Sequence, residues 1–264
     1  MAVLPERHLA DLTGPEVLDH LGERSILVQP LGAVEQHGPH LPLSTDLVIA
    51  EATANAAVGA ARDLDVWLLP PLAYTKSNEH AWSSGTIWLS ATTLLAVLDD
   101  IGRCVARTGA RKLVFLNGHG GNSALTAMAN RELRLAHGLM TFLVHPFVPA
   151  DQGGASADGE AGAGVHGGTD ETSVMLHLRP DLVDMSRAVA NVPHWLQEFE
   201  RVRFGGSVPF GWTSDDFGPL GHIGDPTAAS AELGARLFDQ GVDHVVKSLR
   251  EIDRFEFRDR DSSS

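Results

Sequence analysis

Residues 26–46 read Ile-Leu-Val-Gln-Pro-Leu-Gly-Ala-Val-Glu-Gln-His-Gly-Pro-His-Leu-Pro-Leu-Ser-Thr-Asp. The stretch opens with a short apolar run, residues 26–31, which is typical of a buried strand. Two carboxylates and an imidazole follow it: Glu35, His37 and Asp46. Burying charged groups beside a strand is costly unless they are paired or bound to a metal. We therefore predict that a cation holds these three side chains together.

The rest of the chain alternates apolar runs with segments of helical periodicity. We expect further short strands at residues 66–69, 112–116 and 140–144. The expected helices cover residues 45–63, 91–108, 122–137, 170–177 and 228–250. Such alternation favours an α/β fold with a mainly parallel sheet that helices cover on both faces. Functional side chains in these folds gather at the carboxyl ends of the strands.

The composition is typical of one large globular domain. The chain has 264 residues, of which 43% are hydrophobic and 20% charged, and its formal net charge is −14. An acidic body repels phosphate backbones and anionic lipids, so we expect no nucleic-acid partner and no membrane association. No apolar run is long enough to span a bilayer and no secretory signal is visible, which favours a cytoplasmic location. We expect a single domain over residues 1–257 and a disordered polar tail at 258–264.

Cysteine and histidine usage limits the kind of metal site. The sequence has one cysteine, Cys104, and 13 histidines. A disulfide within the chain and a thiolate zinc cluster are therefore excluded. Any transition-metal site must be built from nitrogen and oxygen ligands.

Two further segments carry reactive side chains. Residues 117–122 read Asn-Gly-His-Gly-Gly-Asn, and their glycines let the backbone turn tightly around His119. Residues 166–173 read His-Gly-Gly-Thr-Asp-Glu-Thr-Ser and place Glu171 in the first turn of a predicted helix. Structural alternatives stay open: His119 could be a structural hydrogen-bonding residue, and Asp46 and Glu171 could be carboxylates that stabilise helix N-termini. Neither segment has the spacing of a phosphate loop or of a serine-hydrolase elbow.

Two loops complete the set of candidates. A polar loop contains the candidate substrate-binding residues Glu79, His80, Ser84, Gly85 and Thr86. Residues 151–164 are so rich in glycine that we expect no regular structure there. This segment could form a lid over the site or a passive surface loop.

Together, the motifs resemble the creatininase family of metal-dependent amidohydrolases. The resemblance rests on Pro-Leu-Gly-Ala-Val-Glu-Gln-His-Gly-Pro-His-Leu-Pro-Leu at 30–43 with Asp46, Glu79-His80 before Ser84-Gly-Thr86, Asn-Gly-His-Gly-Gly-Asn at 117–122, His166 through Glu171-Thr-Ser173, and Gly224-Asp-Pro226. It implies a three-layer α/β/α fold with a mainly parallel central sheet, often assembled as a homohexamer. It also implies two divalent ions per chain, which would be zinc, manganese or iron.

The resemblance also implies roles for single residues. The implied metal ligands are Glu35, His37, Asp46, which would bridge the ions, and His119, and the implied catalytic residues are His166 and Glu171. In creatininase itself a glutamate follows the histidine of the glycine-rich motif, where this chain has Gly121. We therefore expect Glu171 to supply the missing ligand. Creatininase also closes a tryptophan from the segment corresponding to 151–164 over its substrate, and this chain has none there, which argues against creatinine.

We interpret the chain as a hydrolase that cleaves a non-peptide C–N bond in a small cyclic or linear amide. Metal-activated water would attack the carbonyl carbon, and His166 would protonate the leaving nitrogen. A peptidase of the mycofactocin-precursor type and a formamide hydrolase remain alternatives within the family. A non-catalytic protein with one structural ion is an alternative of a different class.

Overall fold

A four-stranded parallel sheet forms the centre of the computed structural model, which describes residues 7–258. The strands are β1 (Ile26–Leu31), β2 (Val66–Leu68), β3 (Lys112–Asn117) and β4 (Met140–Val144), in the order β2-β1-β3-β4. Ile26 pairs with Val66 and Lys112, and Lys112 pairs with Met140. All four predicted strands are confirmed, with bounds that agree to within one residue. Because the strands are parallel and in register, their carboxyl ends meet at one edge of the sheet.

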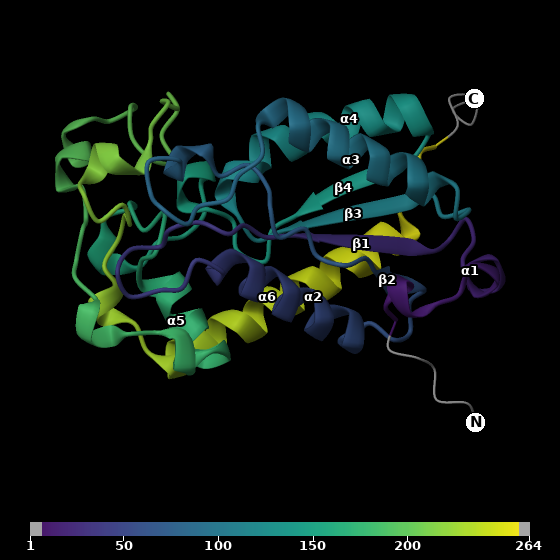
Figure 1. Cartoon of the computed structure of the whole chain (residues 1–264), viewed down its shortest axis with the longest axis horizontal. Helices are drawn as coiled ribbons and strands as arrows, with labels where there is room; N and C mark the ends of the chain where they lie inside the picture. Colours follow the sequence, from purple (N-terminus) through teal and green to yellow (C-terminus); the bar gives the residue numbers. More distant parts are fainter. Residues whose placement is uncertain (1–6, 259–264) are drawn as a thin grey trace.

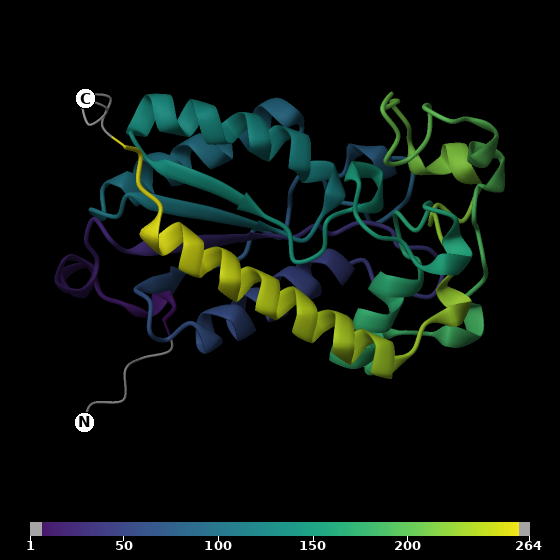
Figure 2. The same cartoon turned by 180° about the vertical axis from the view of Figure 1, so that it is seen from behind.

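Helices cover both faces of this sheet. They are α1 (Gly14–His20), α2 (Thr45–Ala60), α3 (Ala91–Ala106), α4 (Ser123–His137), α5 (Thr169–Leu178) and α6 (Ala231–Arg254). Helices α3 and α4 pack together on one face, while α2 and α6 pack together on the other (Figure 1, Figure 2). This arrangement is the predicted three-layer α/β/α fold. Short 3-10 helices lie at Leu9–Asp11, Asn78–His80, Gly120–Asn122, Ala150–Gln152, Asp158–Glu160, Pro180–Leu182, Met185–Arg187, His194–Glu198, Ser214–Phe217 and Pro226–Ala228.

Alternate strand residues fill two apolar cores. Leu27 and Leu113 belong to the core beneath α3 and α4. Ile26 and Val114 belong to the core between the sheet and α2 with α6. Successive strand side chains point to opposite faces, so a sheet covered on both sides needs apolar residues at every position. This explains why the strands read as continuous apolar runs rather than alternating ones.

The sequence pattern did not predict α1, a short helix before the first strand. Its N-terminus is a capping box in which the backbone N–H of Thr13 donates to the Glu16 carboxylate at 2.7 Å. Pro15 occupies the first turn, where its missing N–H costs nothing. The signal for this helix therefore lies in three polar or cyclic residues and not in apolar periodicity.

The last helix begins later than predicted because a separate turn precedes it. Asp225 accepts a hydrogen bond from the backbone N–H of Thr227 at 3.0 Å, which forms the 3-10 turn Pro226–Ala228. Ser230 then caps α6 by accepting from the backbone N–H of Leu233 at 3.1 Å.

The irregular chain gathers at the carboxyl ends of the strands. Residues 145–230, apart from α5, run through loops and 3-10 turns at this end of the molecule, drawn in green in Figure 1. The glycine-rich segment 151–164 contains the 3-10 helix Asp158–Glu160 and the last two residues of the 3-10 helix Ala150–Gln152. The prediction that this segment has no regular structure is wrong in this respect.

A buried carboxylate anchors that segment to the rest of the fold. Oε1 of Glu160 accepts hydrogen bonds from the backbone N–H groups of Thr169 and Asp225, both at 2.8 Å. Oε2 accepts from the Ser156 hydroxyl at 3.1 Å. A side chain at Gly168 would overlap this carboxylate. Glu160 therefore joins the loop to the first turn of α5 and to the turn before α6.

Glu160→Ala should lower the free energy of unfolding by about 3 kcal/mol, because it leaves buried backbone donors without an acceptor. Glu160→Gln keeps the shape and one acceptor oxygen, so its loss should be smaller. Urea unfolding of both variants measures the difference. A loss below about 1 kcal/mol for the alanine variant would show that the carboxylate is not a structural anchor.

Two further predictions concern the C-terminal tail and the absence of membrane association. Residues 259–264, most of the predicted disordered tail, lie outside them, and Arg258 is exposed. Within residues 7–258, none of the helices combines the length and apolar character that a bilayer crossing requires.

Candidate metal centre

Four of the predicted ligands meet where β1 and β3 end. Glu35 and His37 follow β1, Asp46 lies in the first turn of α2, and His119 follows β3. All four side chains are buried. Neighbouring parallel strands end at the same edge of the sheet, which brings these distant positions together.

Hydrogen bonds from two buried asparagines fix the loop that carries His119. The Asn117 side chain donates to the carbonyl oxygen of His119 at 2.7 Å and accepts from its backbone N–H at 3.2 Å. Oδ1 of Asn122 accepts from the backbone N–H of Lys76 at 3.1 Å. The glycine-rich motif is thus a turn that holds one imidazole and docks a second loop against it.

Asp46 lies between two histidines. Its Oδ1 is 3.1 Å from Nε2 of His37, and its Oδ2 is 3.1 Å from Nδ1 of His119. The carboxylate therefore points into the cluster. A position in the first turn of α2 also favours its negative charge, so the helix-terminal role and the role in the cluster are compatible.

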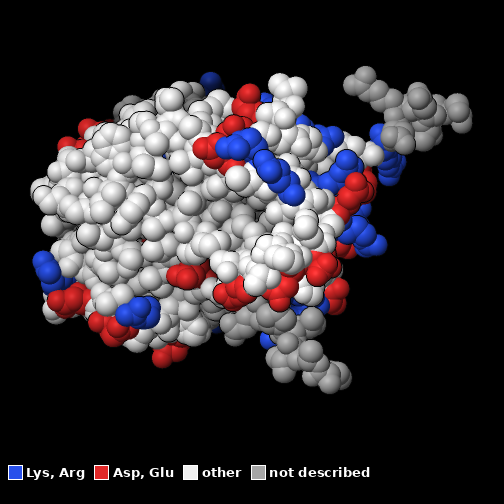
Figure 3. Space-filling model, turned by 45° about the vertical axis from the view of Figure 1, so that its right-hand side comes forward, with Lys and Arg blue, Asp and Glu red and all other residues white. Residues whose placement is uncertain are grey.

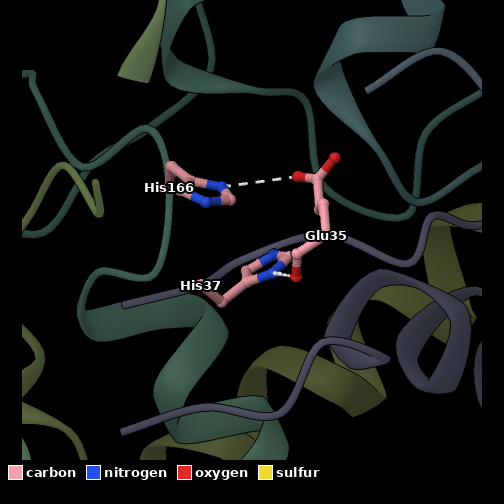
Figure 4. A group of neighbouring side chains, drawn as sticks. All are labelled: Glu35, His37 and His166. Atoms are coloured by element: carbon pink, nitrogen blue, oxygen red, sulfur yellow. Dashed lines mark hydrogen bonds and ion pairs between the residues drawn. The ribbon is translucent and has the colours of Figure 1, made fainter. Parts of the chain in front are cut away.

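Imidazole rings surround the Glu35 carboxylate. Its Oε1 lies 3.2 Å from Nε2 of His80 and 3.7 Å from Nδ1 of His166, and its Oε2 lies 3.3 Å from Nε2 of His119. Figure 4 shows the His166 ring facing this carboxylate, whereas the His37 ring contacts the backbone carbonyl of Glu35. Glu35 and His37 therefore contribute to different sides of the cluster.

The segment carrying His166 and Glu171 reaches the cluster through a short antiparallel pairing. The backbone N–H of Ile223 donates to the carbonyl of His166 at 2.7 Å, and the reverse bond is 3.1 Å long. Oε2 of Glu171 lies 4.0 Å from Nε2 of His37 and accepts from the backbone N–H of Gly167 at 2.6 Å. Gly167 has a φ of +63°, a conformation that glycine adopts without strain.

Among residues 7–258, three sets of side chains have potential ligand atoms, one from each residue, that lie within 4.8 Å of one another. They are Glu35, Asp46 and His119; His37, Asp46 and Glu171; and Glu35, His37 and His166. Asp46 belongs to the first two sets. A residue that bridges two ions must contribute to both ligand sets, as Asp46 does.

The donor atoms fit divalent cations. Among the residues that the structure describes, both carboxylate oxygens of Glu35 and Oδ2 of Asp46 are buried without a hydrogen-bond partner. A buried charged acceptor without partners is costly, and a bound cation would remove this cost. Imidazole nitrogens with carboxylate oxygens suit zinc, manganese and iron.

Without a cation, the carboxylates favour the charged forms of two of these histidines. Burial alone would lower the pKa of His37, but Asp46, together with Glu171 and Glu35, outweighs it and raises the pKa to about 10. Burial also opposes charging of His119, yet Glu35 and Asp46 raise its pKa well above the ordinary value. Burial raises the pKa of the Glu171 carboxyl to about 7.

Metal binding at pH 7 should therefore release about one proton from each of His37 and His119, because an imidazole must be neutral at the nitrogen that binds a metal. Apparent metal affinity should rise with pH for the same reason. Titration calorimetry in buffers with different ionisation enthalpies measures the protons released. Heats that do not depend on the buffer would contradict the prediction.

His166 differs from these two because it is held neutral. Burial, reinforced by His80 and His37, keeps the pKa of His166 well below its ordinary value. Its Nε2 lies 2.6 Å from the backbone carbonyl of Gln36, which only accepts hydrogen bonds, so Nε2 carries the proton. The lone pair is therefore on Nδ1, the nitrogen that faces Glu35.

Part of the cluster lines a cavity of about 420 Å³. Among the predicted substrate-binding residues, Glu79 and His80 line this cavity, and Ser84, Gly85 and Thr86 do not. Ser84 and Gly85 are exposed, and the Thr86 hydroxyl accepts a backbone hydrogen bond from the β1–α2 loop. In one chain, these three residues are therefore not placed to contact a substrate in the cavity.

The sequence did not point to several residues that shape this cavity. Phe147 and Phe210 contribute to its lining, and so does Trp212, which the sequence offers as a pocket or interface residue with core packing as the stronger alternative. The Ser214 hydroxyl accepts a hydrogen bond from Trp82 Nε1 at 2.6 Å and lies 2.9 Å from Nδ1 of a cavity-lining histidine. Phe210, Trp212 and Ser214 belong to an irregular region without a periodic pattern. The only sequence signal for a pocket in this region is its content of aromatic residues.

A family model described as creatininase, creatinine amidohydrolase, matches residues 10–249. The chain belongs to the creatininase family. This confirms the family indicated by the motifs and makes the chain a member of a family of hydrolases that act on amide bonds.

Curated relatives carry two different activities in their names. A mycofactocin precursor peptide peptidase from Mycobacterium ulcerans is 40% identical over 232 residues, which is 85% of this chain and 84% of the relative. A creatinine amidohydrolase from Pseudomonas putida is 37% identical over 185 residues, which is 64% of this chain and 70% of the relative.

Solved creatininases share the fold. A creatinine amidohydrolase structure aligns with a TM-score of 0.74 and 26% identity over 96% of this chain and 100% of the other. A structure described as creatininase Mn aligns with a TM-score of 0.72 and 27% identity, over 95% of this chain and 100% of the other. A creatininase variant described as Zn-Zn type aligns with a TM-score of 0.73 and 27% identity, over 96% of this chain and 100% of the other.

Proposed function

We propose that this creatininase-family hydrolase cleaves an amide bond in a peptide, at a centre that holds two divalent ions. The observation that carries the proposal is the pair of donor sets that share Asp46 and open on a cavity with an apolar wall. Neither set requires the glutamate that Gly121 replaces.

The two donor sets that share Asp46 define two candidate ion positions. Glu35, Asp46 and His119 would hold one ion. His37, Asp46 and Glu171 would hold the other, so Glu171 supplies the carboxylate expected from the sequence. Divalent ions held there would supply a nucleophile at neutral pH by acidifying water, and they would polarise the carbonyl group of the substrate.

His166 is the residue best placed to move a proton. Its Nε2–H is fixed on the carbonyl of Gln36, and its neutral Nδ1 faces the cluster. Nδ1 would accept the proton that water loses as its oxygen attacks the carbonyl carbon. The same nitrogen would deliver that proton to the leaving nitrogen as the C–N bond breaks.

Two observations support a peptide rather than a small cyclic amide as the substrate. The relative that aligns with 85% of this chain is named a peptidase, whereas the creatinine amidohydrolase aligns with 64%. The segment 151–164 also lacks the tryptophan expected of an enzyme that closes over creatinine. A non-peptide C–N bond, which the sequence motifs favour, is the second candidate because of the 37% identity to creatinine amidohydrolase.

A substrate panel tests this choice. Purified protein loaded with zinc, manganese or iron would be assayed on short peptides with the C-terminal sequence of a mycofactocin precursor, on creatinine and on simple formamides. Peptide cleavage, with little or no creatinine turnover, is the expected result. Creatinine turnover without peptide cleavage would favour the second candidate, and no turnover with any ion would contradict both.

We also propose a homo-oligomer, a hexamer by the family resemblance, located in the cytoplasm. Trp82, Ile87 and Trp88 lie close together in sequence and expose 42–47% of their surface, and a contiguous patch of exposed large apolar side chains is typical of a protein–protein interface. Figure 3 shows a broad area without charged side chains in the left half of the face that it draws. Light scattering after size exclusion should give the mass of several chains, and a monomer at micromolar concentration would contradict the assembly.

A further inference from the structure

Gly121 leaves a space that the carboxylate of Glu79 occupies. A β-carbon at position 121 would overlap Oε1 of Glu79 and lie 2.5 Å from Nε2 of His119. Glu79 comes from the 3-10 helix Asn78–His80, far from the glycine-rich motif in sequence. Its carboxylate therefore reaches His119 only because position 121 has no side chain.

The backbone carbonyl of Lys76 determines which nitrogen of His119 is free. This oxygen lies 2.8 Å from Nε2 in hydrogen-bond geometry, and a carbonyl oxygen only accepts. Nε2 therefore carries a proton when the ring is neutral, and a metal ion in this direction would collide with the carbonyl. The lone pair is on Nδ1, which lies 3.1 Å from Oδ2 of Asp46.

Glu79 is held where it can share the Nε2 proton. Its Oε1 lies 3.4 Å from Nε2 of His119, on which Oε2 of Glu35 also borders at 3.3 Å, and its own Oε2 lies 3.0 Å from Nζ of Lys76. The Glu79 side chain is only 11% exposed. The lysine ammonium and the imidazole therefore hold the two oxygens of one carboxylate.

We propose that Glu79 is a positioning residue that orients His119 as an Nδ1 ligand, and this proposal rests on the metal centre proposed above. Asp46 and Nδ1 of His119 would then hold the ion, so that Glu35 could turn from Nε2 to the same ion and Nε2–H would donate to the Lys76 carbonyl and the Glu79 carboxylate. Such outer partners fix the tautomer of a ligand histidine and make its free nitrogen a stronger donor. Glu79 would act through His119 and not by contact with the substrate or the ion.

Metal affinity of Glu79 variants tests the proposal. Zinc dissociation constants would be measured by chelator competition for the wild type, Glu79→Ala and Glu79→Gln. Glu79→Ala should weaken one of two ions by about 10- to 100-fold and leave the other unchanged. Glu79→Gln should show a smaller loss because it keeps an acceptor oxygen. The matched control is Asp151→Asn, which removes another cavity-lining carboxylate and should bind both ions as the wild type does.

Two further measurements separate positioning from other roles. The visible spectrum of the cobalt-loaded Glu79→Ala protein at saturation should match the wild type, because no direct ligand is lost. A crystal structure of the zinc-loaded wild type should show the ion on Nδ1 of His119. An altered cobalt spectrum, an ion on Nε2, or unchanged zinc affinity with a raised KM would each overturn the proposal.

The wild type separates failure of this proposal from failure of the proposed function. If it binds no stoichiometric ion, the metal centre itself is wrong. If it binds two ions and Glu79→Ala binds both equally well, only the role of Glu79 is wrong.

Discussion

His37→Ala is expected to lose bound metal and hydrolytic activity together. His37 is buried, its Nε2 lies 3.1 Å from Asp46 and 4.0 Å from Glu171, and it is the only nitrogen donor in that set. Without it, the second ion would be held by carboxylates alone. The loss of metal-derived stabilisation amounts to several kcal/mol, which corresponds to a fall in kcat/KM of about 10³-fold or more.

Metal counting and turnover on the same sample check this result. The matched control is His137→Ala, which removes a histidine that pairs with Asp99 at the far end of α4. The control should keep both ions and full activity. Activity of His37→Ala close to the wild type after removal of metal would refute the scheme.

His166→Ala is expected to keep its metal and lose most of its turnover. Its ring packs 4.2 Å from the rings of His37 and His80, and its Nδ1 faces Glu35, but neither of the two proposed ion positions includes it. Removing a residue that transfers protons costs about 10²- to 10⁴-fold in kcat. The expected pattern is therefore a large fall in kcat at unchanged metal content.

Free imidazole provides a positive control for this variant. The buried space left by the ring should admit imidazole, which should restore part of the activity of His166→Ala. Elemental analysis of the same sample should match the wild type. Loss of one ion per chain would instead assign His166 to the third donor set, with Glu35 and His37, as a metal ligand.

The central layer of the fold was predictable because it depends on local apolar runs. The strands β1, β2 and β3 are buried at every position, and β4 is buried at both ends and half-buried between them, so their apolar composition identifies them as strands. The helix α1 was missed because it is short and its signal is the pair Thr13 and Glu16. The 3-10 turn Asp158–Glu160 was missed because it is held by the contacts of one buried carboxylate, that of Glu160, with distant backbone donors.

The candidate site was predictable as a set of residues and not as a geometry. The motifs place Glu35, His37 and His119 just after predicted strands. In the structure these strands are neighbours in the sheet, and the three side chains lie in one cluster. The two possible roles of Asp46 could not be separated, because both place it in the first turn of a helix. The contact between Glu79 and Gly121 depends on how two loops pack, which no local pattern records.

Counting metal ions in the purified, metal-replete protein tests the central claim most directly. Elemental analysis should find two divalent ions per chain, both removable by chelators and both restored with activity. Finding no divalent ion in stoichiometric amount would contradict the account, and so would a single ion that chelators cannot remove.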